Sequence, residues 1–333
     1  MKKKFLILFS TITGLLLLVL IFYLVDIRQV FFQTKEIGFL GAGIFIINAF
    51  FVIFISSLSW RLILKSYGYH LPFKDILTAK LMGLMVSYLT PSMYIGGEPL
   101  RTYVISKKHG LPFTKIGATV VVDKFLELGA GLVFVYLGSI CTLIEYELSP
   151  QIYFTLLIVN ILFGLGMGLL LVSFVFENKI FTNLAISLGR INPLSKVIGK
   201  IIPQISEIEG EVFLAFKQHR RETLIAFIFN LLSGLLIFLK PAIFFYFLKI
   251  IFSLSQLALL FALTHLVLAL QFTPGALGIF ELGAVGIYQL VGIGPDKALA
   301  FSLMVRITDL IGASVAIFLI IRFGLRRFWE RKE

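Results

Sequence analysis

Charged residues are scarce in this sequence. Asp, Glu, Lys and Arg make up only 14% of its 333 residues, hydrophobic residues make up 59%, and the mean hydropathy is +0.99. An average soluble domain carries about 25% charged residues. The composition therefore excludes a water-soluble globular fold and predicts a polytopic membrane protein.

Cysteine is limited to Cys141, which excludes a disulfide framework and a thiolate metal cluster. We expect Cys141 to fill a small gap in the packing. The phosphate-binding GxxxxGK[ST] loop, the GxSxG elbow and the HExxH metal motif are also missing. We expect no cofactor, no metal and no catalytic residue, and we expect that this chain alone does not drive transport with ATP.

Acidic residues are outnumbered, 18 against 30 basic residues, which gives a net charge of +12. The basic residues stand between apolar runs and do not follow one soluble face, so the charge does not indicate nucleic acid. They are typical of topology determinants and of contacts with anionic lipid headgroups.

Long apolar runs predict six membrane crossings. Met1 to Lys4 form a basic start, and the run that follows at 5–25 is long enough to cross a bilayer and lacks a cleavage motif. We interpret it as an uncleaved first span with the amino terminus inside. The other predicted spans are 37–59, 116–144, 152–176, 222–248 and 298–321.

A polar signature occurs twice in this apolar background. TPSMYIGGE at 90–98 is matched by TPGALGIFE at 273–281, and KFLEL at 124–128 is matched by RITDL at 306–310. A bilayer penalises buried charge and non-helical backbone. Two copies of proline, glycine and carboxylate at membrane depth therefore predict a shaped site.

Each copy lies in an apolar stretch that does not have the pattern of a single membrane-spanning helix. In 76–108 the apolar run stops at Thr90 and Pro91, which favours a helical hairpin that enters and leaves by one face. In 254–294 the limbs are longer, so a re-entrant pair or two crossings both fit. Proline frees backbone groups, and glycine permits close approach of a headgroup or of another helix. The predicted hinge residues are Thr90, Pro91, Gly96, Gly97, Thr273, Pro274, Gly275 and Gly278.

The basic residues predict the topology. With both hairpins re-entrant, 21 of the 30 basic residues face the cytoplasm, which places both termini there. Similar elements inserted from opposite faces indicate inverted-topology repeats, which build transport sites at mid-membrane. We therefore predict an all-α transmembrane bundle with two inverted repeats, as a single membrane domain over 1–333. Its parts are a first span and loop at 1–36, repeat one at 37–144, a linker span with a cytoplasmic amphipathic segment at 145–221, and repeat two at 222–325.

The stretch 177–221 is the only sizeable soluble segment. Within it, apolar residues at three-and-four spacing over 194–212 predict an amphipathic helix. An interfacial helix and a helix packed beneath the bundle both fit this pattern.

Basic residues at membrane depth are candidates for binding a phosphate headgroup, which needs donors and cations inside hydrocarbon. For Arg101 and Arg306 we favour this role, because a planar guanidinium group can donate hydrogen bonds to two oxygens of one phosphate. For Lys124 we favour pairing with a neighbouring carboxylate, and Asp309 offers Arg306 the same alternative. The full set of predicted substrate-binding residues is Arg101, Arg306, Glu98, Glu281, Lys124, Asp123, Glu127 and Asp309.

Glu98 and Glu281 occupy matching positions in the two copies. A carboxylate at a re-entrant tip is suited to titrating a proton or to balancing an arginine. Capping a helix that begins after the Thr-Pro hinge is the alternative, because negative charge is favourable at a helix amino terminus.

The blocks SYLTPSMYIGGEPLR, TVVVDKFLEL and QFTPGALGIFE resemble those of the lysylphosphatidylglycerol synthetase membrane-domain family, flippase-like integral membrane proteins of the UPF0104 type. The resemblance covers roughly residues 5 to 325. It implies a polytopic helical bundle that moves a lipid between leaflets. In larger members a soluble aminoacyl-transferase domain follows; this sequence ends at Glu333, so we expect no such domain here.

Three functions stay open. The first is a transporter or flippase for an anionic phospholipid or lipid-linked headgroup in the plasma membrane. The second is an intramembrane transferase acting on a lipid, in the manner of phosphatidylglycerol lysyltransferase, with Asp123, Glu127 or Glu98 as base. The third is an accessory subunit of a separate lipid-modifying enzyme. We rank them in that order.

Overall fold

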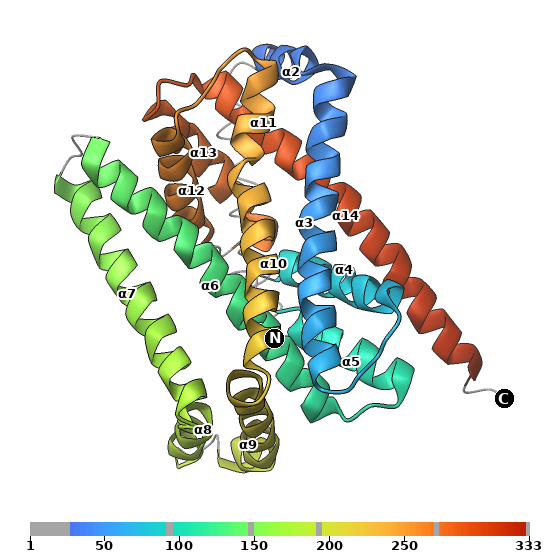
Figure 1. The fold of residues 1–333 in the computed structure, drawn as a ribbon. Helices are drawn as coiled ribbons and strands as arrows, with labels where there is room; N and C mark the ends of the chain where they lie inside the picture. Colours follow the sequence, from blue (N-terminus) through green and yellow to red (C-terminus); the bar gives the residue numbers. More distant parts are fainter. Residues whose placement is uncertain (1–26, 91–95, 146–149, 191–194, 270–272, 331–333) are drawn as a thin grey trace.

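The computed structural model describes residues 27–90, 96–145, 150–190, 195–269 and 273–330, and the described chain is helical with connecting turns (Figure 1). The helices, in chain order, are α2 (Ile27–Glu36), α3 (Gly38–Ser66), α4 (Phe73–Leu89), α5 (Glu98–His109), α6 (Phe113–Glu145), α7 (Pro150–Val175), α8 (Ile180–Gly189), α9 (Ser195–Lys217), α10 (Arg220–Phe238), α11 (Lys240–Phe247), α12 (Leu254–Ala269), the 3₁₀ turn η1 (Pro274–Ala276), α13 (Ile279–Gln289) and α14 (Pro295–Glu330).

Four described helical segments are long and apolar enough to cross a membrane: α3, α6, α10 continued by α11, and α14. They confirm the predicted spans at 37–59, 116–144, 222–248 and 298–321. The predicted span at 152–176 corresponds to α7, which passes the same test together with α8, at a bend of 104°. The predicted first span at 5–25 lies outside the described residues.

The two hinge-bearing stretches form shorter helices. α4 and α5 flank the first hinge, and α12, η1 and α13 make up the second. α12 has 16 residues and α13 has 11, fewer than the roughly 20 residues that a crossing helix needs. In Figure 1, α4 lies near the middle of the bundle and α5 toward the end that carries α8 and α9, whereas α12 and α13 lie toward the opposite end.

The amphipathic segment forms α9, and the apolar side of its carboxyl-terminal part packs inside the protein. Val212, Phe213 and Phe216 belong to a buried cluster with residues of α6 and α10. Tyr67, directly after α3, donates a hydrogen bond of 2.6 Å to the backbone oxygen of Glu211. Burial raises the pKa of the Tyr67 hydroxyl, which keeps it a donor at neutral pH. The carboxyl-terminal part of α9 is therefore a packed helix and not an interfacial one.

Candidate functional site

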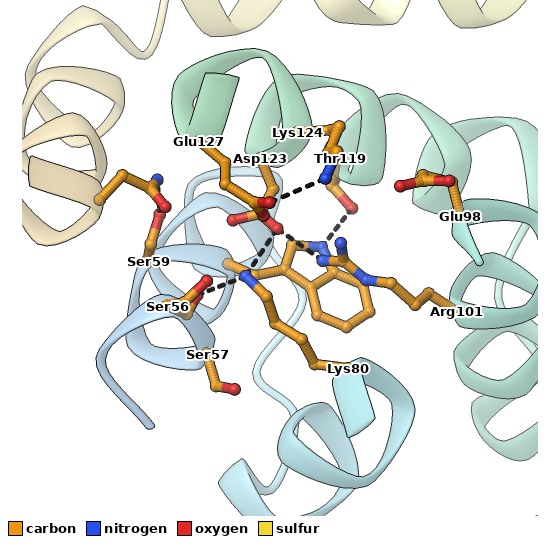
Figure 2. A network of polar contacts seen from close by, with 12 residues as sticks. Ser56, Ser57, Ser59, Lys80, Glu98, Arg101, Thr119, Asp123, Lys124 and Glu127 are labelled. Atoms are coloured by element: carbon orange, nitrogen blue, oxygen red, sulfur yellow. Dashed lines mark hydrogen bonds and ion pairs between the residues drawn. The ribbon is translucent and has the colours of Figure 1, made fainter. Parts of the chain in front are cut away.

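A buried charge cluster lies between α4, α5 and α6 in the first half of the chain, 37–144 (Figure 2). One carboxylate oxygen of Asp123 accepts from the Arg101 guanidinium at 2.6 Å and from Lys80 Nζ at 3.0 Å. Lys80 also donates to the backbone oxygen of Ser56 at 2.8 Å. We call Lys80, Arg101 and Asp123 the Asp123 cluster. Two buried cations thus share a single carboxylate.

The Arg101 guanidinium lies over the indole ring of Trp60, with its central carbon 4.2 Å from the ring centroid. The indole N–H donates to Thr119 Oγ1 at 3.1 Å, which fixes the ring plane. Arg101 is only 4% exposed. Its Nε is buried and has no hydrogen-bond partner among the described residues. The cation is therefore held by stacking and one ion pair, with donor capacity to spare.

Lys124 and Glu127 form an ion pair of 2.7 Å at the edge of the Asp123 cluster. This is the pairing that we favoured for Lys124. Glu98, the first residue of α5, has a buried Oε2 without a hydrogen-bond partner in the described chain. Lys124 lies within electrostatic range of Glu98. The structure thus brings five of the predicted site residues together and adds Lys80, which the sequence reasoning missed.

The first hinge is closed by a backbone contact. A Cβ on Gly97 would collide with the backbone carbonyl of Gly83 in α4, and a Cβ on Gly83 would collide with the Arg101 side chain. Ser87 Oγ accepts a hydrogen bond of 2.9 Å from the Gly97 N–H. Glycine at 97 is therefore required because α4 packs closely against α5. Of the two alternatives for the hinge glycines, close approach of a headgroup or of another helix, this contact is the second. Pro91 lies outside the described residues.

Thr90 and Thr273 hold their hinges differently. Thr90 Oγ1 donates back to Val86 O in α4 at 2.8 Å. Thr273, which is fully buried, donates forward to Leu277 O at 2.9 Å, across η1. The matching threonines thus finish a helix in one copy and close a turn in the other. Gly96, beside Gly97, is partly buried.

The second half, 222–325, holds its charge in another way. Arg306 in α14 makes five hydrogen bonds, and a guanidinium has five N–H donors. The acceptors are both carboxylate oxygens of Glu281, the Tyr88 hydroxyl, and the backbone oxygens of Gly275 and Ala276. We call these groups the Arg306 cluster. In this conformation each guanidinium N–H faces a protein acceptor.

Glu281 also accepts a hydrogen bond of 2.8 Å from the Gly278 N–H, so it caps α13 while it pairs with Arg306. This confirms capping for Glu281 and also gives it an arginine partner. Gly278 has φ +78° and Gly275 has φ +60°, a region that favours glycine. A Cβ on Gly275 would collide with the ring of Tyr88. The second hinge therefore fits closely against α4, a helix of the first half.

Asp309, one turn after Arg306, makes no ion pair with it among the described residues, since the acceptors of Arg306 lie elsewhere. Lys240, the first residue of α11, is its strongest electrostatic neighbour. The sequence does not reveal that Lys240, within the predicted span 222–248, lies near Asp309.

Comparison with known proteins gives the family. A model of the lysylphosphatidylglycerol synthase TM region matches residues 6–317. A UPF0104 membrane protein of Methanocaldococcus jannaschii is 25% identical over 267 residues, 77% of this chain and 76% of the relative. A UPF0104 membrane protein of Pyrococcus horikoshii is 23% identical over 259 residues, 75% of this chain and 76% of the relative. No solved structure matches the chain. This chain is therefore an integral membrane protein that belongs to the lysylphosphatidylglycerol synthase TM region family.

Proposed function

We propose that this protein moves an anionic phospholipid or a lipid-linked phosphate between leaflets, and that the Asp123 cluster binds the headgroup. The main support for the proposal is that Lys80 and Arg101 both bind the same carboxylate oxygen of Asp123. Charged side chains inside a membrane protein are costly and mark substrate pathways by default. Within the Asp123 cluster two cations face one carboxylate, and the next negative neighbour, Glu127, already pairs with Lys124, so a phosphate can bind to the two cations.

Arg101 suits phosphate for a geometric reason as well. Its Nε has no partner among the described residues, and a guanidinium edge binds two phosphate oxygens at once. Lys124, which lies near the unpaired carboxylate of Glu98, supplies a further cation. In the described part of the chain, Lys124 has two negative neighbours, its ion-pair partner Glu127 and the more distant Glu98. An incoming phosphate would take the place of Glu98. The cost of removing the headgroup from water is thereby offset by fixed cations.

Two re-entrant hairpins of opposite direction would bring this site to mid-membrane. This proposal is supported by the positions of the helices, because α5 lies toward one end of the bundle, α12 and α13 lie toward the other, and α4 lies near the middle (Figure 1). The hinges also approach each other, because Arg306 binds both Tyr88, near the end of α4, and the backbone of Gly275. The charge distribution favours a cytoplasmic location for the end with α8 and α9, and for both termini.

Transport is favoured over an intramembrane transferase. The proposed bases were Asp123, Glu127 and Glu98, and two of these carboxylates already bind cations. A base that is engaged in this way is a poor proton acceptor. An accessory role beside a separate lipid-modifying enzyme needs the same headgroup site, so it predicts lipid binding without movement by this protein alone.

Reconstituted liposomes test the proposal. The purified protein is inserted into vesicles that carry fluorescent phosphatidylglycerol, a fluorescent polyprenyl phosphate or fluorescent phosphatidylcholine, and a membrane-impermeant quencher reports lipid movement. We expect faster movement of an anionic species than of phosphatidylcholine. Arg101→Gln is expected to slow it at least tenfold, since about 1.4 kcal/mol is a factor of ten and a charged hydrogen bond contributes about 1.5–3 kcal/mol.

The matched control is Lys107→Gln, an exposed position on the same helix. It removes one positive charge from α5 without touching the Asp123 cluster, and we expect it to move lipid at the wild-type rate. Equal rates for the two variants, with both proteins monodisperse, would remove Arg101 from the site. Anionic lipid binding without movement in the wild type would favour the accessory role.

A further inference from the structure

Helix α8 turns sharply away from the end of α7. The two helix axes differ by 104°, and Glu177 in the connection has φ +58°. α7 has 26 residues and no charged side chain, which is enough to cross a bilayer, so a helix at nearly a right angle to a crossing α7 would run roughly along the membrane plane. For 194–212 an interfacial helix and a packed helix were both open from the sequence, and the carboxyl-terminal part of α9 packs inside the protein.

α8 presents three distinct sides. One side is buried against α9 and contains Thr182 and Ala185. A second side is apolar and exposed, at spacings of three and four residues that place its members together. It consists of Ile180, Phe181, Leu184 and Leu188, which are 40%, 41%, 54% and 39% exposed. A third side carries the exposed polar residues Asn183 and Ser187 and is followed by Arg190 at the helix end, and the exposed Ile186 lies between this side and the buried one.

A carboxylate from α9 fixes the orientation of α8. Glu209 is buried and accepts hydrogen bonds from the backbone N–H groups of Phe181 and Thr182, each at 3.0 Å, and from Thr182 Oγ1 at 2.6 Å. These are N–H groups that a helix leaves unsatisfied at its start. The apolar side of α8 is therefore held outward, because the helix cannot roll onto that side without losing this cap.

We infer that α8 lies in the interface of the leaflet where α7 ends, with its apolar side in the acyl chains and its polar side in water. The occupant is a phospholipid surface, because the exposed apolar surface of α7, at Leu169, Val172 and Phe176, continues toward α8. An exposed polar side next to an apolar one is typical of interfacial helices, which insert about 5–10 Å deep. This role is independent of the headgroup site.

Site-directed spin labelling tests the inference on the full chain. In a Cys141→Ser background, Leu184→Cys and Asn183→Cys place one nitroxide on the apolar side and one on the polar side of the same helix. In phospholipid nanodiscs, we expect the label at 184 to collide mainly with oxygen, which concentrates in lipid, and the label at 183 with a water-soluble nickel complex. Leu188→Cys and Arg190→Cys repeat the comparison at the end of the helix.

Equal access of the nickel complex to all four labels would overturn the inference, since α8 would then lie in water. Dipolar broadening of the spectrum of the label at 184, relieved by dilution with unlabelled protein, would also overturn it, because a second copy would then cover the apolar side. The same pattern of contacts in nanodiscs of phosphatidylcholine and of phosphatidylglycerol supports apolar insertion.

Discussion

Arg101 and Arg306 are both buried, 4% and 9% exposed, yet their surroundings differ. Arg306 uses its five donors on protein acceptors, among them two backbone carbonyls of the second hinge. Arg101 shares one carboxylate oxygen with Lys80 and keeps a buried Nε without a partner in the described residues. A saturated arginine fixes a backbone, whereas an unsaturated one has capacity to bind a ligand.

The two occurrences of the Thr-Pro signature differ in their basic neighbours. Counted from Thr90 and Thr273, Arg101 corresponds to Ala284 and Lys80 to Leu263. The basic groups of the Asp123 cluster therefore have no basic counterpart around the second signature. Of the shared residues, Glu281 pairs with Arg306, while Lys124 pairs with Glu127 and leaves Glu98 unpaired among the described groups. The headgroup site that we propose is thus asymmetric.

Removing the saturated arginine should have the largest effect on stability. Arg306→Gln leaves Glu281 buried at 1% exposure without its cation and frees two backbone carbonyls. Loss of one partner from a buried pair costs about 3–5 kcal/mol. We expect a marked fall in the melting temperature of the detergent-solubilised protein, measured by loss of the monodisperse peak in size-exclusion chromatography.

Arg101→Gln is the matched comparison in the same melting experiment. Asp123 keeps Lys80 as its counter-ion in this variant, so the fall in melting temperature should be clearly smaller. Equal losses for the two arginines would contradict the division into a structural and a ligand-binding cluster.

Asp123→Asn tests the Asp123 cluster by removing its carboxylate in place of one of its cations. The variant leaves Lys80 and Arg101 without their shared carboxylate, and we expect a loss of about 1.5–3 kcal/mol, the contribution of a hydrogen bond to a charged group. An anionic lipid that binds the cluster should restore stability, by about 2.7 kcal/mol at one hundred times its dissociation constant. Melting curves with and without added phosphatidylglycerol measure this rescue.

Glu281→Gln serves as the control for lipid rescue, because it also removes one carboxylate from a buried arginine. The guanidinium of Arg306 keeps its hydroxyl and backbone acceptors in that variant, so added phosphatidylglycerol should restore little. Rescue of both variants to the same extent would mean that the lipid acts on the whole protein and not at the Asp123 cluster.

The sequence predicted the apolar spans and the hinge regions of this protein better than its tertiary contacts. Four spans and the two hinge regions follow from apolar length and from the Thr-Pro signature, which are local properties. Lys80 escaped notice because it lies in an apolar run and has no counterpart in the second copy. Its role depends on the position of α4 beside α6, which spacing along the chain does not reveal.

Long-range partners limited the prediction in two other places. The sequence offers Arg306 a carboxylate one turn away, at Asp309, but the close packing of η1 brings Glu281 and the hinge carbonyls nearer. Glu209 lies in the amphipathic segment, where the sequence gives no sign of a partner, yet it caps α8 from a neighbouring helix. In both cases the tertiary contact outweighs the local pattern.

Tyr88→Phe gives the smallest expected effect and tests the contact between the halves. The substitution keeps the ring that packs on Gly275 and removes only the hydroxyl that accepts from Arg306 at 2.8 Å. One guanidinium N–H then loses its acceptor, at a cost of about 0.5–1.5 kcal/mol. We expect a small fall in melting temperature, less than for Arg306→Gln, and no change in rescue by phosphatidylglycerol. If Tyr88→Phe abolished that rescue in the Asp123→Asn background, the two clusters would be energetically coupled through α4, and their separation into independent sites would be wrong.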